Sequence, residues 1–127
     1  MTIAYWCVFI AAVLPYALAL SWRLGNPAYG LAANRAPRRC AETLTGWRLR
    51  AHWAHLNGLE TFAPFAAAVI VAHQLGASQA RLDALALAYI GFRLGHAAFY
   101  LADLGVARSL AFGGGVACTV AIFFSAL

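Results

Sequence analysis

A long apolar run constrains this sequence more than any other feature. Residues 2–22 contain no charged side chain, and as a helix this run is about 31 Å long, enough to cross the hydrocarbon core of a bilayer. Arg23 follows the run and no basic residue precedes it. We therefore expect a retained membrane anchor rather than a cleaved signal peptide.

Three further segments are apolar enough to be membrane spans. With 64% hydrophobic and 10% charged residues, the chain differs from an ordinary soluble globule. Gly, Pro and Arg interrupt the apolar pattern over 23–46, which we interpret as a basic loop. The expected spans are 2–22, 47–74, 80–104 and 106–127. The sequence thus predicts an all-α fold, a single membrane domain over 1–127 built as a four-helix bundle.

The arginines predict the orientation of this bundle. The nine basic residues are all arginine, and with four acids they give a net charge of +5. Six lie around the first connection and one beside the third: Arg23, Arg35, Arg38, Arg39, Arg48, Arg50 and Arg108. Because basic connections favour the cytoplasmic side, we expect both termini on the other side. This placement favours a membrane surface or a small anionic ligand, and argues against nucleic acid.

A polar stripe runs along the third expected span. Tyr89, Arg93, His96, Tyr100 and Asp103 recur every three or four residues, which places them on one helical face. A guanidinium at the bilayer centre costs about 2.5–3.5 kcal/mol, so Arg93 needs a partner or a water-filled cavity. Glu60, the only acid in the second span, is the expected partner. Their pair is either purely structural or part of a binding site.

The second expected span has two polar faces. One face carries Arg50, Trp53, Asn57, Glu60 and Pro64, and the opposite face carries Arg48, His52 and His55. The first face descends into the apolar half of the span and is the candidate binding surface. The second face is expected to meet headgroups or water. His52 and His55 are spaced to share a metal ion, but no third ligand follows at a suitable spacing, so no metal site is predicted.

The polar groups of the last three spans suit a peptide-sized zwitterion with net negative charge, next to a lipophilic molecule. Arginines would pair with its carboxylates, and Glu60 with its ammonium group. At the start of the fourth span, Arg108 and Ser109 offer a cation and a hydroxyl. They would stabilise a thiolate on such a ligand, although an arginine at this position also serves as a membrane anchor.

Three motifs together resemble one family, the membrane-associated proteins in eicosanoid and glutathione metabolism (MAPEG). The signature of its second helix is similar to three parts of this sequence: Arg50, the segment His55–Glu60 and Pro64-Phe65. Arg93, His96 and Tyr100 resemble its third-helix motif, and Arg108-Ser109 resembles the start of the fourth helix in its prostaglandin E synthase branch. The segments 34–38 and 44–47 are similar to bacterial members. The resemblance covers nearly the whole chain.

The resemblance implies a homotrimer in a bacterial inner membrane, with glutathione between adjacent subunits on the cytoplasmic side. By position, the residues that would bind glutathione or line its site are Arg50, Asn57, Glu60, Arg93, His96 and Tyr100, and those acting at its thiol are Arg108 and Ser109. Trp53 and Leu56 stand where glutathione-using relatives carry further arginines. The positive charge of those missing arginines would have to come from Arg50, from Arg48 or from the arginines of the first connection.

The leading functional prediction is a membrane-bound glutathione transferase or peroxidase-like enzyme. Glutathione, as co-substrate, would attack a lipophilic electrophile or hydroperoxide that arrives from the membrane lipid. The alternative is a non-enzymatic lipid-binding or scaffold protein of the same fold, which the residues Trp53 and Leu56 favour. A small transporter or channel is a third interpretation, and it rests only on Arg93 and Glu60 within the membrane.

Overall fold

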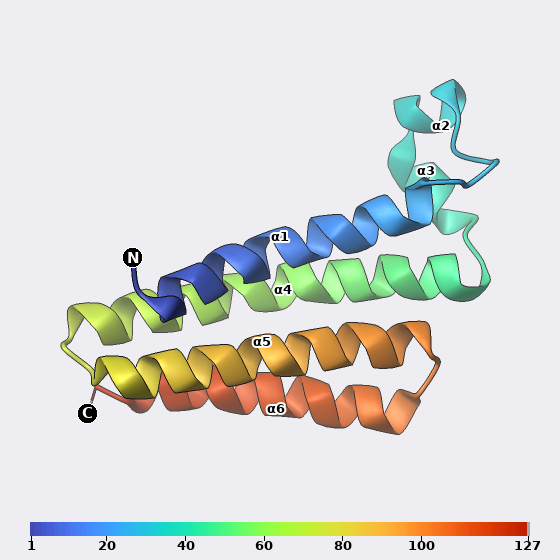
Figure 1. The fold of residues 1–127 in the computed structure, drawn as a ribbon. Coiled ribbons are helices and arrows are strands. Elements are labelled where there is room, and N and C mark those ends of the chain that lie inside the picture. Colours follow the sequence, from blue (N-terminus) through green and yellow to red (C-terminus); the bar gives the residue numbers. More distant parts are fainter. Residues whose placement is uncertain (127) are drawn as a thin grey trace.

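Four long helices form the body of the protein, in a computed structural model that describes residues 1–126 (Figure 1). They are α1 (Ile3–Arg23), α4 (Gly46–Gln74), α5 (Gln79–Leu101) and α6 (Gly105–Phe124). Each is long and apolar enough to cross a membrane. The predicted all-α four-helix fold is confirmed, and the chain is an integral, multi-pass membrane protein.

Local hydrogen bonds determine where these helices begin and end. Asp83 Oδ1 accepts a hydrogen bond of 2.8 Å from the backbone N–H of Ala4, so α5 caps the first turn of α1. Helix α5 ends at Leu101, three residues before its expected end, because Asp103 adopts a positive φ of 63° and closes the helix. Helix α6 ends at Phe124, and Leu127, the last residue of the fourth expected span, lies outside the described residues.

The long helices are arranged as two pairs, α1 with α4 and α5 with α6, and α4 also contacts both helices of the second pair (Figure 1). Where α1 crosses α4, Gly58 faces Pro15, and a Cβ atom on Gly58 would lie 2.8 Å from Pro15 Cγ. Small residues permit such close approach inside a membrane, where packing rather than hydrophobic burial holds helices together. The α1–α4 pair therefore depends on the absence of a side chain at this position.

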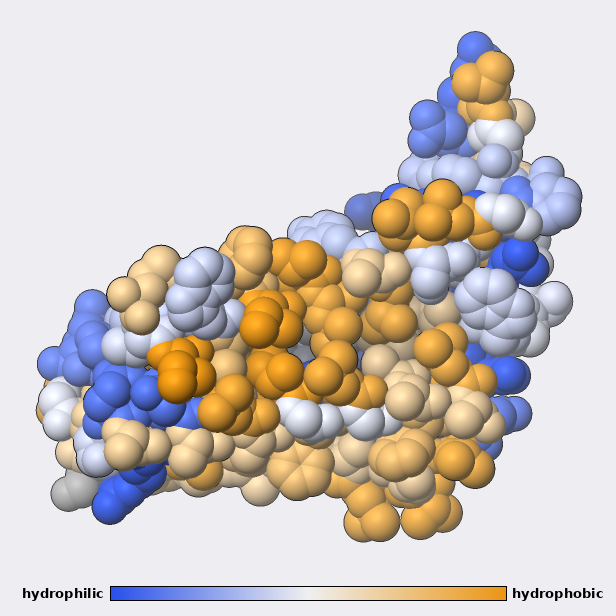
Figure 2. Space-filling model, viewed as in Figure 1, coloured by the Kyte–Doolittle hydropathy of each residue, from blue (hydrophilic) through white to orange (hydrophobic). Residues whose placement is uncertain are grey.

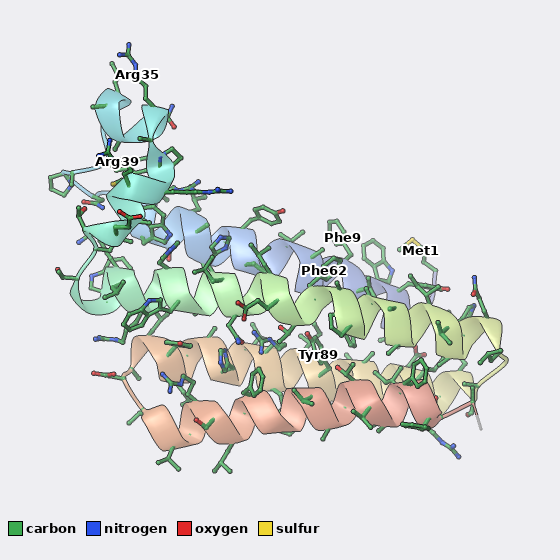
Figure 3. All side chains as sticks on the ribbon, turned by 180° about the vertical axis from the view of Figure 1, so that it is seen from behind. Met1, Phe9, Arg35, Arg39, Phe62 and Tyr89 are labelled. Atoms are coloured by element: carbon green, nitrogen blue, oxygen red, sulfur yellow. The ribbon has the colours of Figure 1, made fainter. Side chains whose placement is uncertain are left out.

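The core and the outer surface are both apolar. Inside the bundle, the rings of Phe65 and Tyr89 stack with their centroids 3.7 Å apart. Outside, Phe9 of α1 is 57% exposed, and Figure 3 shows it pointing away from the bundle. On the face that Figure 2 shows, hydrophobic residues cover the middle of the bundle, whereas hydrophilic residues gather at its two ends. This distribution fits a protein whose flanks are solvated by lipid.

The connection between α1 and α4, expected as a loop, contains two short helices. These are α2 (Leu31–Arg35) and α3 (Pro37–Glu42), and they project from the bundle at the end opposite both termini (Figure 1). Pro37 occupies the first turn of α3, where its missing N–H costs no hydrogen bond. A small second core anchors the projection, made of Trp22, Ala41, Leu44 and Ala51.

Candidate functional site

Arg93 and His96 of α5 are buried in the interior, with exposed fractions of 5% and 3%. Arg93 Nη2 donates a hydrogen bond of 2.9 Å to Asn57 Oδ1 of α4. A guanidinium has five N–H donors, so this bond leaves donors for a ligand. The pairing of Arg93 with Glu60 that the sequence suggested is wrong: within residues 1–126 no ion pair joins them, and the Glu60 side chain is exposed.

Tyr100 and Arg108 extend this cluster toward the arginine-rich end of the bundle. The rings of His96 and Tyr100 meet edge to face at 5.2 Å, and Arg108 Cζ of α6 lies 4.6 Å from the Tyr100 ring centroid. Such cation–π contact fixes the Arg108 guanidinium beside the end of α5. His96 Nδ1 is buried and has no hydrogen-bond partner among the described residues. Buried polar atoms in native proteins nearly always have a partner, so the unpartnered Nδ1 indicates that His96 does more than fill space in the interior.

Arg50 and Ser109 make other contacts. Arg50 Nε donates to the carbonyl oxygen of Leu101 at 3.2 Å, and its Nη1 lies 3.7 Å from Asp103 Oδ2. Arg50 thus binds the end of α5, where cations interact favourably with free carbonyl groups. Ser109 is exposed, and its Oγ donates to the carbonyl oxygen of Gly105 at 3.1 Å. The structure therefore brings together Asn57, Arg93, His96, Tyr100 and Arg108, and places Arg50 and Ser109 in separate local contacts.

A cavity of about 280 Å³ lies between α4, α5 and α6 beside Arg93. Glu60 lines it together with Arg93, so both residues face one space although they form no ion pair. Most of the remaining wall is apolar: Pro64, Phe112, Gly115, Val116 and Val120. The cavity thus has a polar side, which includes Glu60 and Arg93, and a larger apolar side.

Sequence reasoning missed several residues of this cavity. Thr61 and Thr119 line it, and the Thr61 carbonyl oxygen accepts a hydrogen bond of 3.1 Å from the Tyr89 hydroxyl. Phe112 also lines the cavity, and its ring lies 6.2 Å from that of His96. These residues occur within ordinary apolar stretches of α4 and α6. No motif or charge in the sequence identifies them as cavity residues. They are identified only by the way α4 and α6 pack in the structure.

The opposite face of α4 packs against α1, whereas headgroups or water were expected there. His55 Nδ1 lies 2.7 Å from the carbonyl oxygen of Pro15, and the His52 ring lies 5.6 Å from the Trp22 ring. Across residues 1–126, no group of three His, Cys, Asp or Glu side chains could hold a metal ion. Trp53, by contrast, faces the candidate site, with its ring 6.4 Å from Tyr100.

Comparison with known proteins agrees with these motifs. The model of the MAPEG family matches residues 3–127, essentially the whole chain. The match includes all four long helices and every polar residue of the candidate site. Neither the curated proteins nor the solved structures contain a significant match.

Proposed function

This chain belongs to the MAPEG family of glutathione-related membrane proteins, and on that basis we propose that it is a membrane-bound glutathione transferase or peroxidase-like enzyme. The observation that supports the proposal most strongly is the hydrogen bond between the buried Arg93 and Asn57. A guanidinium in the middle of a membrane helix is costly and indicates a functional site. The partly apolar cavity beside it has room for a lipophilic second substrate.

Each polar residue has a defined role in this proposal. Arg93 and Asn57 bind one end of glutathione, and Glu60 pairs with its ammonium group. His96 offers its unpartnered Nδ1, and Tyr100 holds Arg108 in place. Arg50 takes a glutathione carboxylate by exchanging it for Asp103, whose side chain is 77% exposed. Such an exposed ion pair contributes little and is easily replaced.

Arg108 and Ser109 act on the thiol. The guanidinium and the hydroxyl stabilise the thiolate, which is the reactive form of glutathione. The sulfur attacks an electrophilic carbon, and a C–S bond forms as the leaving group departs with its electron pair. With a hydroperoxide, the sulfur attacks the terminal oxygen, the O–O bond breaks, and the alkoxide takes a proton from water. The resulting sulfenic acid reacts with a second glutathione to form the disulfide and water.

We also propose that three copies assemble into a homotrimer, as the family resemblance implies, in a bacterial inner membrane. The end that carries α2, α3 and the α5–α6 connection faces the cytoplasm, and both termini face outward. Glutathione, which is water-soluble, then enters from the cytoplasmic side, and the lipophilic substrate enters from the bilayer. The mass of the detergent-solubilised protein tests the trimer, and labelling of single cysteines from either side of the membrane tests the orientation.

The test of thiol activation is ultraviolet difference absorbance of the glutathione thiolate. Glutathione is titrated into the purified wild type, into Arg108→Ala and into Arg81→Ala, which removes a charge at the other end of the bundle. We expect a saturable thiolate signal in the wild type and in Arg81→Ala, and its loss in Arg108→Ala. An unchanged signal in Arg108→Ala would remove Arg108 from the mechanism.

A non-enzymatic, lipid-binding protein of the same fold is the second candidate. Trp53 favours it, because an aromatic ring near Tyr100 occupies a position where glutathione-using relatives carry an arginine. This candidate predicts no thiolate signal over a millimolar titration. It also predicts saturable binding of a lipophilic probe that glutathione does not change.

A further inference from the structure

A second, much smaller cavity borders Arg93 where α5 meets α1 and α4. Its volume is about 10 Å³. The residues that line it include Ala11, Pro15, Gly58, Tyr89, Arg93 and His96. Tyr89, which Figure 3 shows inside the bundle, and Arg93 also line the larger cavity between α4, α5 and α6. At its size the small cavity admits about one water molecule and no organic ligand.

Pro15 leaves a backbone acceptor at the wall of this cavity. In an α-helix each N–H donates to the carbonyl oxygen four residues earlier, and proline has no N–H. Helix α1 continues on both sides of Pro15, so the carbonyl oxygen of Ala11 lacks its helical donor. Both ends of this missing hydrogen bond, Ala11 and Pro15, line the cavity. In membrane helices, ordered water is one of the groups that satisfy a carbonyl freed in this way.

The polar side chains nearest to this part of α1 bind other carbonyl groups. His55 Nδ1 lies 2.7 Å from the carbonyl oxygen of Pro15. The Tyr89 hydroxyl donates to the carbonyl oxygen of Thr61 at 3.1 Å. Neither side chain therefore replaces the donor that the carbonyl oxygen of Ala11 has lost.

Arg93 supplies hydrogen-bond donors from the α5 side of the cavity. It is 5% exposed, and one of its N–H groups donates to Asn57 Oδ1. Its guanidinium has further N–H donors beyond that one, and a guanidinium inside a membrane needs a polar partner or water. A water molecule between Arg93 and Ala11 accepts from the guanidinium and donates to the carbonyl oxygen. The His96 ring lines the same cavity and is a further polar neighbour, and buried waters typically have two to four such partners.

We propose that this cavity binds one ordered water molecule, which links the Arg93 guanidinium to the carbonyl oxygen of Ala11. The water gives Arg93 a second polar partner beside Asn57, and it joins α5 to α1 where Pro15 interrupts the helical hydrogen bonds. Arg93 and His96 also belong to the proposed glutathione site. The inference nevertheless goes beyond the proposed function, because the water is expected whether or not glutathione binds.

Hydroxyl-radical footprinting with X-rays tests the proposal on the full-length protein in detergent, without glutathione. Radicals formed from a bound water modify the side chains next to it, and mass spectrometry measures the rate at each residue. Pro15 and His96 are buried and line the cavity, whereas Phe65 and Val69 are buried and line neither cavity beside Arg93. After correction for intrinsic reactivity, we expect faster modification of Pro15 and His96. Rates no higher than those of Phe65 and Val69 would overturn the proposal.

The variant Ala54→Val distinguishes a water in this cavity from general access of solvent. Ala54 is 1% exposed and lines the cavity, so the added methyl groups occupy the space of the water. Ala68→Val is the matched control, because Ala68 is a buried alanine of α4 that does not line the cavity. We expect the modification rate of Pro15 to fall to that of Phe65 in Ala54→Val and to stay at the wild-type rate in Ala68→Val.

An unchanged rate at Pro15 in Ala54→Val would overturn the proposal, because the reactive water would then lie elsewhere. Equal falls in Ala54→Val and Ala68→Val would overturn it as well, because they would indicate a general change in packing. Thermal unfolding in the same detergent verifies that each variant is folded. If Ala54→Val does not fold, the comparison of buried residues within the wild type still decides.

Discussion

The two faces of α4 are built from different kinds of residue. Toward α1, the buried residues Ala51 and Ala54 and the partly buried Gly58 are small and allow the helices to approach closely. Toward α5, Asn57 binds the buried Arg93. Close packing stabilises helix pairs in lipid, whereas a buried guanidinium is costly there. The face toward α1 is therefore explained by helix packing. The face toward α5 is explained by the binding site that we propose around Arg93.

The largest effect is expected from Asn57→Leu. This change removes the hydrogen-bond acceptor of a buried guanidinium, so we expect a loss of about 2 kcal/mol in the free energy of unfolding, together with loss of glutathione binding. Denaturant unfolding in detergent and glutathione calorimetry measure the two effects.

The double variant Asn57→Leu with Arg93→Met is the control for that change. Because it also removes the charge, it should recover stability without recovering glutathione binding. If Asn57→Leu alone unfolds like the wild type, the polar face is not organised around this hydrogen bond.

The next effect concerns the face toward α1. In Gly58→Ala, the new Cβ would lie 2.8 Å from Pro15 Cγ, and we expect a loss of about 1 kcal/mol in the free energy of unfolding from overpacking. Gly91→Ala is the matched control, because a Cβ there meets nothing within 4 Å. Thermal unfolding compares the two variants. Equal stabilities would mean that the α1–α4 contact is not close in the membrane.

Tighter glutathione binding in a variant of the polar face would test the difference between the two faces of α4. Trp53→Arg places a cation on the polar face near Tyr100, and we expect glutathione to bind about tenfold more tightly. Trp47→Arg, which makes the same change at the exposed start of α4, should have little effect. Calorimetry measures both affinities. Equal tightening in the two variants would show that bulk charge, rather than position, limits glutathione binding.

The smallest effect on stability is expected at Arg50, which lies near the start of α4 and pairs with Asp103. Arg50→Gln breaks the ion pair with Asp103, whose side chain is 77% exposed. Pairs of this kind contribute about 1 kcal/mol or less. Unfolding in detergent should therefore change little. A loss as large as that in Asn57→Leu would assign Arg50 a structural role equal to that of Arg93.

Sequence patterns predicted the fold because crossing a bilayer requires about 20 apolar residues in a row. They also predicted that Arg93 is buried against a partner on α4, since the cost of its charge demands one. They named the wrong partner, because Asn57 and Glu60 differ by only one helical turn and the register of α4 against α5 depends on packing. The helices α2 and α3 were missed because short helices have no long apolar period.

Photoaffinity labelling with a glutathione derivative tests most directly whether the polar face of α4 is the binding site. The label is attached to the membrane-embedded protein, and the modified peptides are identified by mass spectrometry. We predict labelling of α4 around Asn57 and of the segment from Arg93 to Ser109, with competition by unmodified glutathione. Labelling confined to α1, α2 and α3 would contradict the assignment.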